Sequence, residues 1–199
     1  MGGTVRDARP DDAATIQHVA RESWHAAYDD IVGAETVDRT IDRWYALDSL
    51  ADDIADAAGR ADATFLVCER ADSAADSDSA RSDGVDNERF GANRGESTGA
   101  ESAVVGFAHA GPHPNLEATA KLSRIYARPG VWGDGVGSRL LERVERDLRE
   151  HFETLWLEVL ADNDVGVSFY EATEFERVGE QESVLGDDAV WEYLYEKGL

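Results

Sequence analysis

Two periodicities alternate along the chain and divide it into predicted strands and helices. Runs rich in β-branched and aromatic residues are typical of strands, whereas apolar residues spaced three or four positions apart are typical of amphipathic helices. A βαβ unit that is followed by a helix and a hairpin indicates an α+β fold, an α/β mixed sheet of about seven twisted strands flanked by helices. The predicted strands cover residues 4–8, 63–69, 102–110, 121–127, 154–161, 175–183 and 189–196. The predicted helices cover residues 10–28, 34–58 as one long or two shorter helices, 136–152 and 163–172.

One stretch between two predicted strands fits neither periodicity. Residues 71–102 are rich in Asp, Ser, Gly and Asn, and they carry eight acidic residues and three arginines with almost no apolar residue. Such a stretch buries too little apolar surface to offset the entropy that is lost on ordering. Because 199 residues suit a single core, we expect one domain over residues 1–199 with a disordered acidic insertion at 71–102.

Acidic residues dominate the composition and narrow the classes of partner. The formal net charge is −23, the isoelectric point is about 4.4, and the basic residues are 17 Arg and two Lys. Nucleic-acid binding needs clusters of Lys and Arg that release counterions from phosphates, so no nucleic-acid partner is expected. An acidic, lysine-poor surface suits a cytoplasm in which high salt screens self-repulsion. We therefore predict a halophilic protein whose melting temperature rises with KCl.

Expectations about location and metal content follow from patterns that do not occur in the sequence. The N-terminal residues lack the apolar stretch of a signal peptide, and no stretch approaches the length of a membrane span. We therefore expect a cytoplasmic protein with no membrane partner. No spacing typical of metal ligands occurs, so no metal is expected. The oligomeric state is left open, a homodimer included.

A glycine-rich loop, RPGVWGDGVGSRLL at residues 128–141, leads into a predicted helix. Glycine accepts positive φ and lets an anion approach the backbone amides, so the loop predicts an anion site at a helix N-terminus. A Walker P-loop is excluded, because Val136 and Gly137 occupy its Lys and Ser/Thr positions. A dinucleotide fingerprint lacks its third glycine at Ser138, although Glu158 at the end of the next strand keeps that alternative open. A plain turn from strand to helix is the third interpretation.

The glycine loop is part of a longer pattern over residues 103–178. LSRIYARPGVWGDGVGSRLL is followed by LWLEVLADNDVGVSFYEATEF. This order of strand, Pro-containing loop, Q/R-x-x-G-x-G/A, helix, strand and Asn-x-x-small-x-x-Phe/Leu-Tyr resembles the GCN5-related N-acetyltransferases, the GNAT family. Three positions depart from the family pattern, with Trp132 at the Gln/Arg position, Asp134 where a basic residue is usual, and Glu174 where glycine is usual. The matching residues are Gly135, Gly137, Asn163, Gly166, Phe169 and Tyr170.

The resemblance implies a GNAT-like acyl-CoA N-acyltransferase fold, and it implies acetyl-CoA as a co-substrate. Backbone amides of the loop and the positive end of the helix dipole would hold its diphosphate. In the family the strands that correspond to 121–127 and 154–161 splay apart, so that the pantetheine arm pairs with exposed main chain. A backbone amide near Ile125, Tyr126 or Ala127 would polarise the thioester carbonyl. The other residues expected to bind acetyl-CoA are Trp132, Gly133, Asp134, Gly135, Val136, Gly137, Ser138 and Asn163.

The resemblance also implies two catalytic side chains. Tyr170 is the candidate general acid for the departing thiolate, with a core tyrosine on an amphipathic helix as the alternative. Glu158 is the candidate base for the attacking amine, with a solvated glutamate at a strand end as the alternative. Alternation along the strand places Glu158 on the face of Trp156 and Leu160. The stretch LWLEV followed by Asn163 and Tyr170 is similar to the ribosomal-protein alanine N-acetyltransferases within the family.

The implied function is transfer of acetyl from acetyl-CoA to a primary amine, of a small molecule or a protein N-terminus, by direct attack in a ternary complex. Two other functions stay open. One is a catalytically silent acyl-CoA-binding regulatory module, which would not need the acid and the base, and the other is a dinucleotide-binding enzyme. The family builds its acceptor pocket from the first helices and the last hairpin, with core packing as the alternative for their aromatic residues. The aromatic residues concerned are Trp24, Tyr28, Trp44 and Tyr45.

Overall fold

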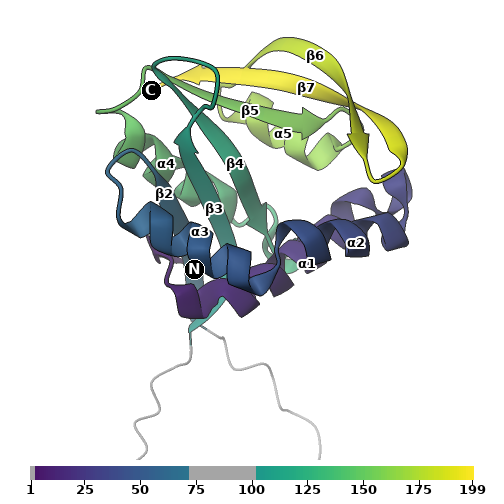
Figure 1. The fold of residues 1–199 in the computed structure, drawn as a ribbon, viewed down its shortest axis with the longest axis horizontal. Helices are drawn as coiled ribbons and strands as arrows, with labels where there is room; N and C mark the ends of the chain where they lie inside the picture. The colour runs from purple at the N-terminus through teal and green to yellow at the C-terminus, as the bar shows by residue number, and fades with distance from the viewer. Residues whose placement is uncertain (1–2, 72–101) are drawn as a thin grey trace, which may run out of the picture.

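A seven-stranded mixed sheet forms the centre of the protein, as Figure 1 shows. The computed structural model describes residues 3–71 and 102–199. The strands lie in the order β1-β2-β3-β4-β5-β7-β6 across the sheet. They are β1 (Thr4–Asp7), β2 (Thr64–Ala71), β3 (Ser102–Pro112), β4 (Thr119–Ala127), β5 (Thr154–Leu160), β6 (Glu176–Leu185) and β7 (Asp188–Gly198). The helices are α1 (Ala13–Val32), α2 (Ala34–Trp44), α3 (Leu47–Ala58), α4 (Val136–Leu148) and α5 (Asp164–Ala172), with short 3-10 turns at Pro10–Asp12 and Pro129–Val131.

The predicted mixed sheet and its flanking helices are confirmed. The helical pattern over 34–58 forms two helices, because the backbone becomes extended at Ala46, with φ −54° and ψ 131°. Strands β2 and β3 form an antiparallel pair that ends at Ala71 opposite Ser102. The insertion was predicted at residues 71–102, but Ala71 belongs to β2 and Ser102 to β3. Residues 72–101 lie outside the described residues, so the disorder of the insertion stays a prediction.

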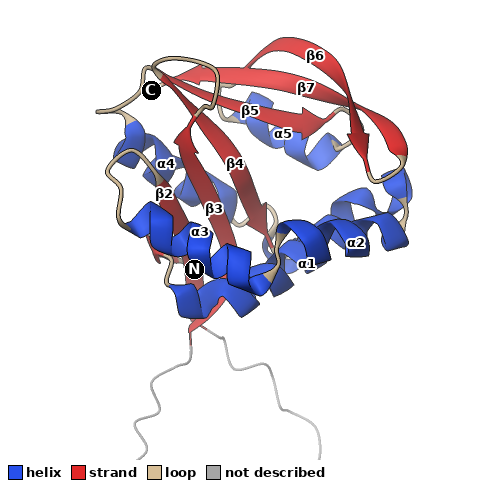
Figure 2. Ribbon diagram, in the orientation of Figure 1, coloured by secondary structure: helices blue, strands red, loops and turns tan. Residues whose placement is uncertain are grey.

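Side-chain alternation along the strands divides the core into two layers. On β2, Phe65 and Val67 face a cluster formed with α1, α2 and α3. Leu66 and Cys68 face the opposite cluster, which is formed with α4 and α5. Both faces of the sheet are therefore covered by helices, as Figure 2 shows. No helix among the described residues is long and apolar enough to cross a membrane.

The apolar pattern after the glycine loop forms α4 as predicted. Gly135 precedes the helix with φ 76°, a left-handed conformation that side chains disfavour. The helix packs against β2 and β3, and this contact fixes the position of its N-terminus. Its buried stripe consists of Val136, Leu140, Leu141, Val144 and Leu148.

Strands β4 and β5 separate part-way along their length. Beyond their paired positions β4 continues along β3, and β5 continues along β7. The C-terminal half of β4 therefore presents main chain on the side that faces β5, and Figure 1 shows the two strands diverging. The predicted splay is confirmed. The paired positions are Thr119↔Thr154, Ala120↔Leu155 and Lys121↔Trp156.

Candidate functional site

The first turn of α4 offers backbone amides that have no acceptor within the helix. Arg139 is the residue whose amide bonds back to the Gly135 carbonyl, at 3.2 Å. The amides of Val136, Gly137 and Ser138 precede it and lack an acceptor four residues earlier. Together with the helix dipole, these amides suit an anion such as a phosphate.

Two other loop residues of the predicted binding set are engaged in the loop's own structure. The Trp132 amide donates to the Pro129 carbonyl at 3.2 Å, and its indole Nε1 donates to the Ala127 carbonyl at 2.8 Å. The Asp134 carboxylate accepts from Arg70 of β2, and this hydrogen bond holds the pKa of Asp134 below its ordinary value. Trp132 therefore ties the loop to the end of β4, and the negative charge of Asp134 is compensated by Arg70 rather than left beside the anion site.

A cavity of about 400 Å³ opens from the loop into the split between β4 and β5. We call it the loop pocket. Its walls come from α1, β4, the loop, β5 and α5. Asp134 is the one member of the predicted set that does not line it, and it borders a separate groove with Arg70 and Arg128. The predicted residues that line the loop pocket are Ile125, Tyr126, Ala127, Trp132, Gly133, Gly135, Val136, Gly137, Ser138, Glu158, Asn163 and Tyr170.

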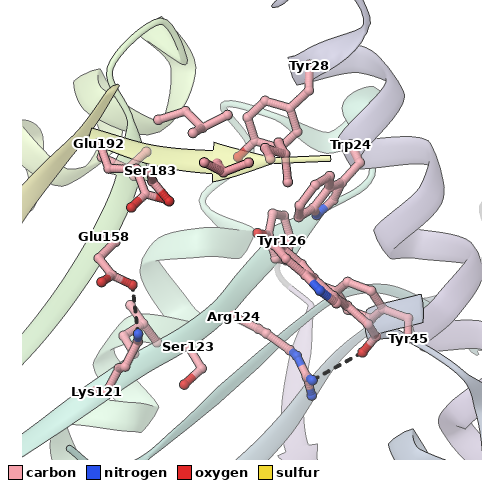
Figure 3. Close-up of a pocket in the computed structure, with 16 residues that line it drawn as sticks. Trp24, Tyr28, Tyr45, Lys121, Ser123, Arg124, Tyr126, Glu158, Ser183 and Glu192 are labelled. Atoms are coloured by element: carbon pink, nitrogen blue, oxygen red, sulfur yellow. Dashed lines mark hydrogen bonds and ion pairs between the residues drawn. The ribbon is translucent and has the colours of Figure 1, made fainter. Parts of the chain in front are cut away.

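A second cavity, of about 350 Å³, lies on the other side of the split and is drawn in Figure 3. We call it the aromatic pocket, because helices α1 and α2 and the segment that follows α2 contribute aromatic side chains to its wall. The β6–β7 hairpin closes the opposite side with Ser183, Val184 and Glu192. The aromatic residues are Trp24, Tyr28, Trp44 and Tyr45 from the helical side and Tyr126 from β4.

The two pockets share part of their walls. Tyr28, Tyr126, Glu158 and Val159 line both cavities. Tyr28 comes from α1, Tyr126 from the unpaired half of β4, and the other two from β5. A molecule in one pocket would therefore meet a molecule in the other at these four residues.

Glu158 is held by two hydrogen bonds at this junction. The ammonium of Lys121 lies 2.7 Å from Oε2 of Glu158, and Nε2 of Gln181 donates to Oε1 at 3.2 Å. Gln181 also donates to Glu192 at 3.0 Å. Neither Lys121 nor Gln181 was predicted from the sequence, although Lys121 is one of only two lysines in the chain.

Tyr170 lies on α5 and is 8 % exposed. Its ring packs edge-on against Phe169 and Phe175, with centroids 5.4 and 5.5 Å away. Burial raises the pKa of Tyr170 far above its ordinary value. The phenol therefore keeps its proton at neutral pH and faces the loop pocket as a donor.

Asn163 caps α5 and also reaches α1. Its Oδ1 accepts from the Gly166 amide at 3.0 Å, and its Nδ2 donates to the hydroxyl of Tyr28 at 3.0 Å. The predicted assignment of Asn163 to the pocket wall thus coincides with a structural role in holding the N-terminus of α5. Among the described residues no group of His, Cys, Asp and Glu side chains is arranged to hold a metal ion.

A sequence model of the acetyltransferase (GNAT) family matches residues 24–175, which is more than half of the chain. The chain belongs to the GNAT family of acetyltransferases. A curated relative, the uncharacterized N-acetyltransferase in the pepI 3′ region of Lactobacillus delbrueckii subsp. lactis, is 35% identical over 80 residues. That match covers 40% of this chain and 46% of the relative, so this chain spans about half the length of the curated relative that it matches.

Solved structures show the same fold over nearly the whole chain. The PaiA N-acetyltransferase of Thermoplasma acidophilum in complex with coenzyme A has a TM-score of 0.73 and 23% identity, and all of both chains is covered. The ribosomal-protein-alanine N-acetyltransferase of Brucella melitensis has a TM-score of 0.58 and 19% identity, with 98% of this chain and 99% of that chain covered. The predicted GNAT fold is therefore confirmed.

Proposed function

We propose that this protein transfers the acetyl group of acetyl-CoA to a primary amine, of a small molecule or a protein N-terminus, by direct attack in a ternary complex. The observation that carries the proposal is the meeting of the loop pocket and the aromatic pocket at Glu158, in the split between β4 and β5. With one substrate in each pocket, the reacting atoms would come together at the shared wall. Such positioning is itself a large part of catalysis of a bimolecular reaction.

The residues of the loop pocket fit acetyl-CoA. The free amides at the start of α4 suit its diphosphate, and left-handed Gly135 leaves room for close approach. The unpaired edge of β4 suits an extended pantetheine arm that adds main-chain hydrogen bonds. The coenzyme A complex of the Thermoplasma relative supports the same ligand. When bound, acetyl-CoA supplies a thioester as the acyl donor.

Glu158 at the shared wall and Tyr170 in the loop pocket would move the protons. Glu158 would take a proton from the attacking amine, directly or through a water molecule, while the nitrogen–carbon bond forms. Tyr170 would donate its proton to the sulfur as the carbon–sulfur bond breaks, and solvent would restore it. The products are the acetylated amine and free coenzyme A.

A binding assay followed by a turnover assay tests this function. We expect acetyl-CoA to raise the melting temperature in high KCl, the condition that suits the predicted halophilic, cytoplasmic origin. A panel of small amines and peptide N-termini is then scored by release of the coenzyme A thiol. Absence of both stabilisation and thiol release would contradict the proposal. Stabilisation without turnover of any amine in the panel would favour a silent acyl-CoA-binding module.

A further inference from the structure

The side-chain amide of Asn163 fixes the direction of its hydrogen bond with Tyr28. Because Oδ1 of Asn163 accepts from the Gly166 amide, Nδ2 is the atom that faces Tyr28. An amide nitrogen donates and does not accept. The oxygen of Tyr28 is therefore the acceptor in this bond, and the phenolic hydrogen remains available for another partner.

That hydrogen belongs to a side chain in the wall shared by both pockets. Tyr28 is 6 % exposed and lines the loop pocket and the aromatic pocket. Figure 3 shows its ring extending from α1 over the cavity. Burial raises the pKa of Tyr28 well above its ordinary value, so the hydrogen is retained at neutral pH.

The surrounding groups also present hydrogens to the cavity. The hydroxyl of Tyr126 faces three donors, the hydroxyls of Tyr28 and Tyr45 and the indole of Trp24, and its oxygen accepts from at most two of them. The indole Nε1 of Trp24 is buried and makes no hydrogen bond of normal geometry with any of the described residues. The wall therefore carries hydrogens that protein groups do not fully satisfy, and a ligand that offers an oxygen acceptor fits it.

We propose that Tyr28 is a further catalytic residue, whose hydroxyl, oriented by Asn163, donates a hydrogen bond to the carbonyl oxygen of the acetyl group at the junction of the two pockets. The inference rests on the proposed function. The carbonyl oxygen gains negative charge as the amine attacks, so a donor aimed at it strengthens its bond in the transition state. Tyr28 thus adds a side-chain donor from α1 to any backbone donor on β4.

Removing the hydroxyl tests the proposal by kinetics. Tyr28→Phe should lower kcat roughly 10-fold or more, while the Kd for acetyl-CoA changes by less than about 3-fold. The matched control is Tyr195→Phe, which removes a tyrosine hydroxyl bonded to Glu171 of α5 at 3.3 Å but outside both pockets. It should keep the wild-type rate. A Tyr28→Phe enzyme with the wild-type kcat would overturn the proposal.

Asn163→Asp separates donation from a merely structural link. The carboxylate still caps α5 and still bonds to Tyr28, but it now accepts the phenolic hydrogen instead of donating to the oxygen. We expect the same loss of kcat as in Tyr28→Phe, and no further loss when both changes are combined. If Tyr28 only ties α1 to α5, Asn163→Asp retains the rate, and the proposal fails. A loss of the same size in the Tyr28→Phe background would show an effect of charge alone and would also overturn it.

A spectroscopic measurement reads the hydrogen bond without an amine. Infrared spectra of bound acetyl-CoA with a ¹³C-labelled carbonyl should show the stretch at higher frequency in Tyr28→Phe and Asn163→Asp than in wild type. An unchanged frequency would overturn the inference. Failure of the proposed function is distinguishable from failure of this inference. In that case the wild-type protein would bind acetyl-CoA without turning over any amine, or would not bind acetyl-CoA at all.

Discussion

The ammonium of Lys121 lies 2.7 Å from Oε2 of Glu158, at the point where β4 and β5 separate. Lys121 belongs to the last pair between the two strands, opposite Trp156, and Glu158 follows two residues later on β5. The pair therefore lies where the pairing between β4 and β5 ends, and both side chains line the aromatic pocket. This placement brings a cation to the group that is proposed to accept the amine's proton.

Glu158→Gln tests the proposed base. The amide cannot take a proton, so turnover should fall at neutral pH. The loss should shrink as pH rises, because a growing fraction of the acceptor amine is then already neutral. Initial rates across pH 7 to about 10 with a fixed amine would show the two profiles converging. Parallel profiles would contradict the assignment of Glu158 as the base.

Lys121→Met tests the ion pair itself. The change leaves Glu158 without its cation, so we expect a lower kcat and a changed KM for the amine. The affinity for acetyl-CoA should change little, because Lys121 lines only the aromatic pocket. The chain offers a matched control in Lys197→Met, which removes a similar pair with Glu145 at 2.6 Å outside both pockets. If both variants lose the same activity, the effect of Lys121 is structural.

Tyr170→Phe tests the proposed acid. The ring and its contacts with Phe169 and Phe175 are retained, so stability should change by no more than about 1 kcal/mol. Turnover should fall roughly 10²-fold, whereas acetyl-CoA affinity should hardly change, because proton donation to sulfur develops in the transition state. Calorimetric binding and thiol release on the same preparations provide both numbers. A wild-type rate would make Tyr170 a core residue.

Gly135→Val tests the anion site at α4. A branched side chain at φ 76° is strained and stands beside the free amides, so acetyl-CoA binding should be lost. Gly130→Ala is the control, since a Cβ there meets nothing within 4 Å and Gly130 does not line the loop pocket. Thermal unfolding without ligand shows whether each variant folds. Equal acetyl-CoA affinity in folded Gly135→Val and wild type would remove the loop from the site.

The helices and strands could be predicted from the sequence because the apolar periodicity of each one is complete within a few neighbouring residues. The stripe of α4 follows the 3.6-residue period, and the alternation along β2 separates Leu66 from Phe65 and Val67. The break between α2 and α3 at Ala46 carries no glycine or proline and could not be chosen from pattern alone. Glu174 has φ 67°, so the backbone there takes the left-handed turn usual for the family's glycine even with a side chain.

The contacts that organise the site depend on residues far apart in the chain. Asn163 bonds to Tyr28, 135 residues away, and Lys121 bonds to Glu158, 37 residues away. Neither Tyr28 nor Lys121 is marked by a motif, because their contacts depend on the packing of α1 and on the register of β4 with β5. The glycine loop was visible in the sequence because several signals fall together over a short range. Arg70, which compensates Asp134, required the fold to bring β2 beside the loop.

The titration of His109, on β3, should make the free energy of unfolding depend on pH. Its ring stacks on Phe65 at 4.8 Å, and burial, aided by Arg124 of β4 and opposed by Asp53 and Asp56 of α3, lowers the pKa of His109 to about 4. In the unfolded chain the imidazole of His109 has its ordinary pKa near 6.5, so it binds a proton at a pH where the imidazole of the folded protein is still neutral. His109 therefore contributes stability that is fully present above pH 6.5 and is lost as pH falls toward 4, by about 3 kcal/mol.

Replacing the imidazole isolates this contribution from that of the many carboxylates. His109→Phe keeps a ring against Phe65 and removes a buried Nδ1 that has no hydrogen-bond partner among the described residues. Urea unfolding in constant KCl, at pH 7.5 and at pH 4.5, should show that wild type loses about 2.5 kcal/mol more free energy of unfolding than the variant does. The carboxylates titrate alike in both proteins, so the difference reports His109. Equal losses would mean that the imidazole is protonated in the folded state and that the buried, neutral form is wrong.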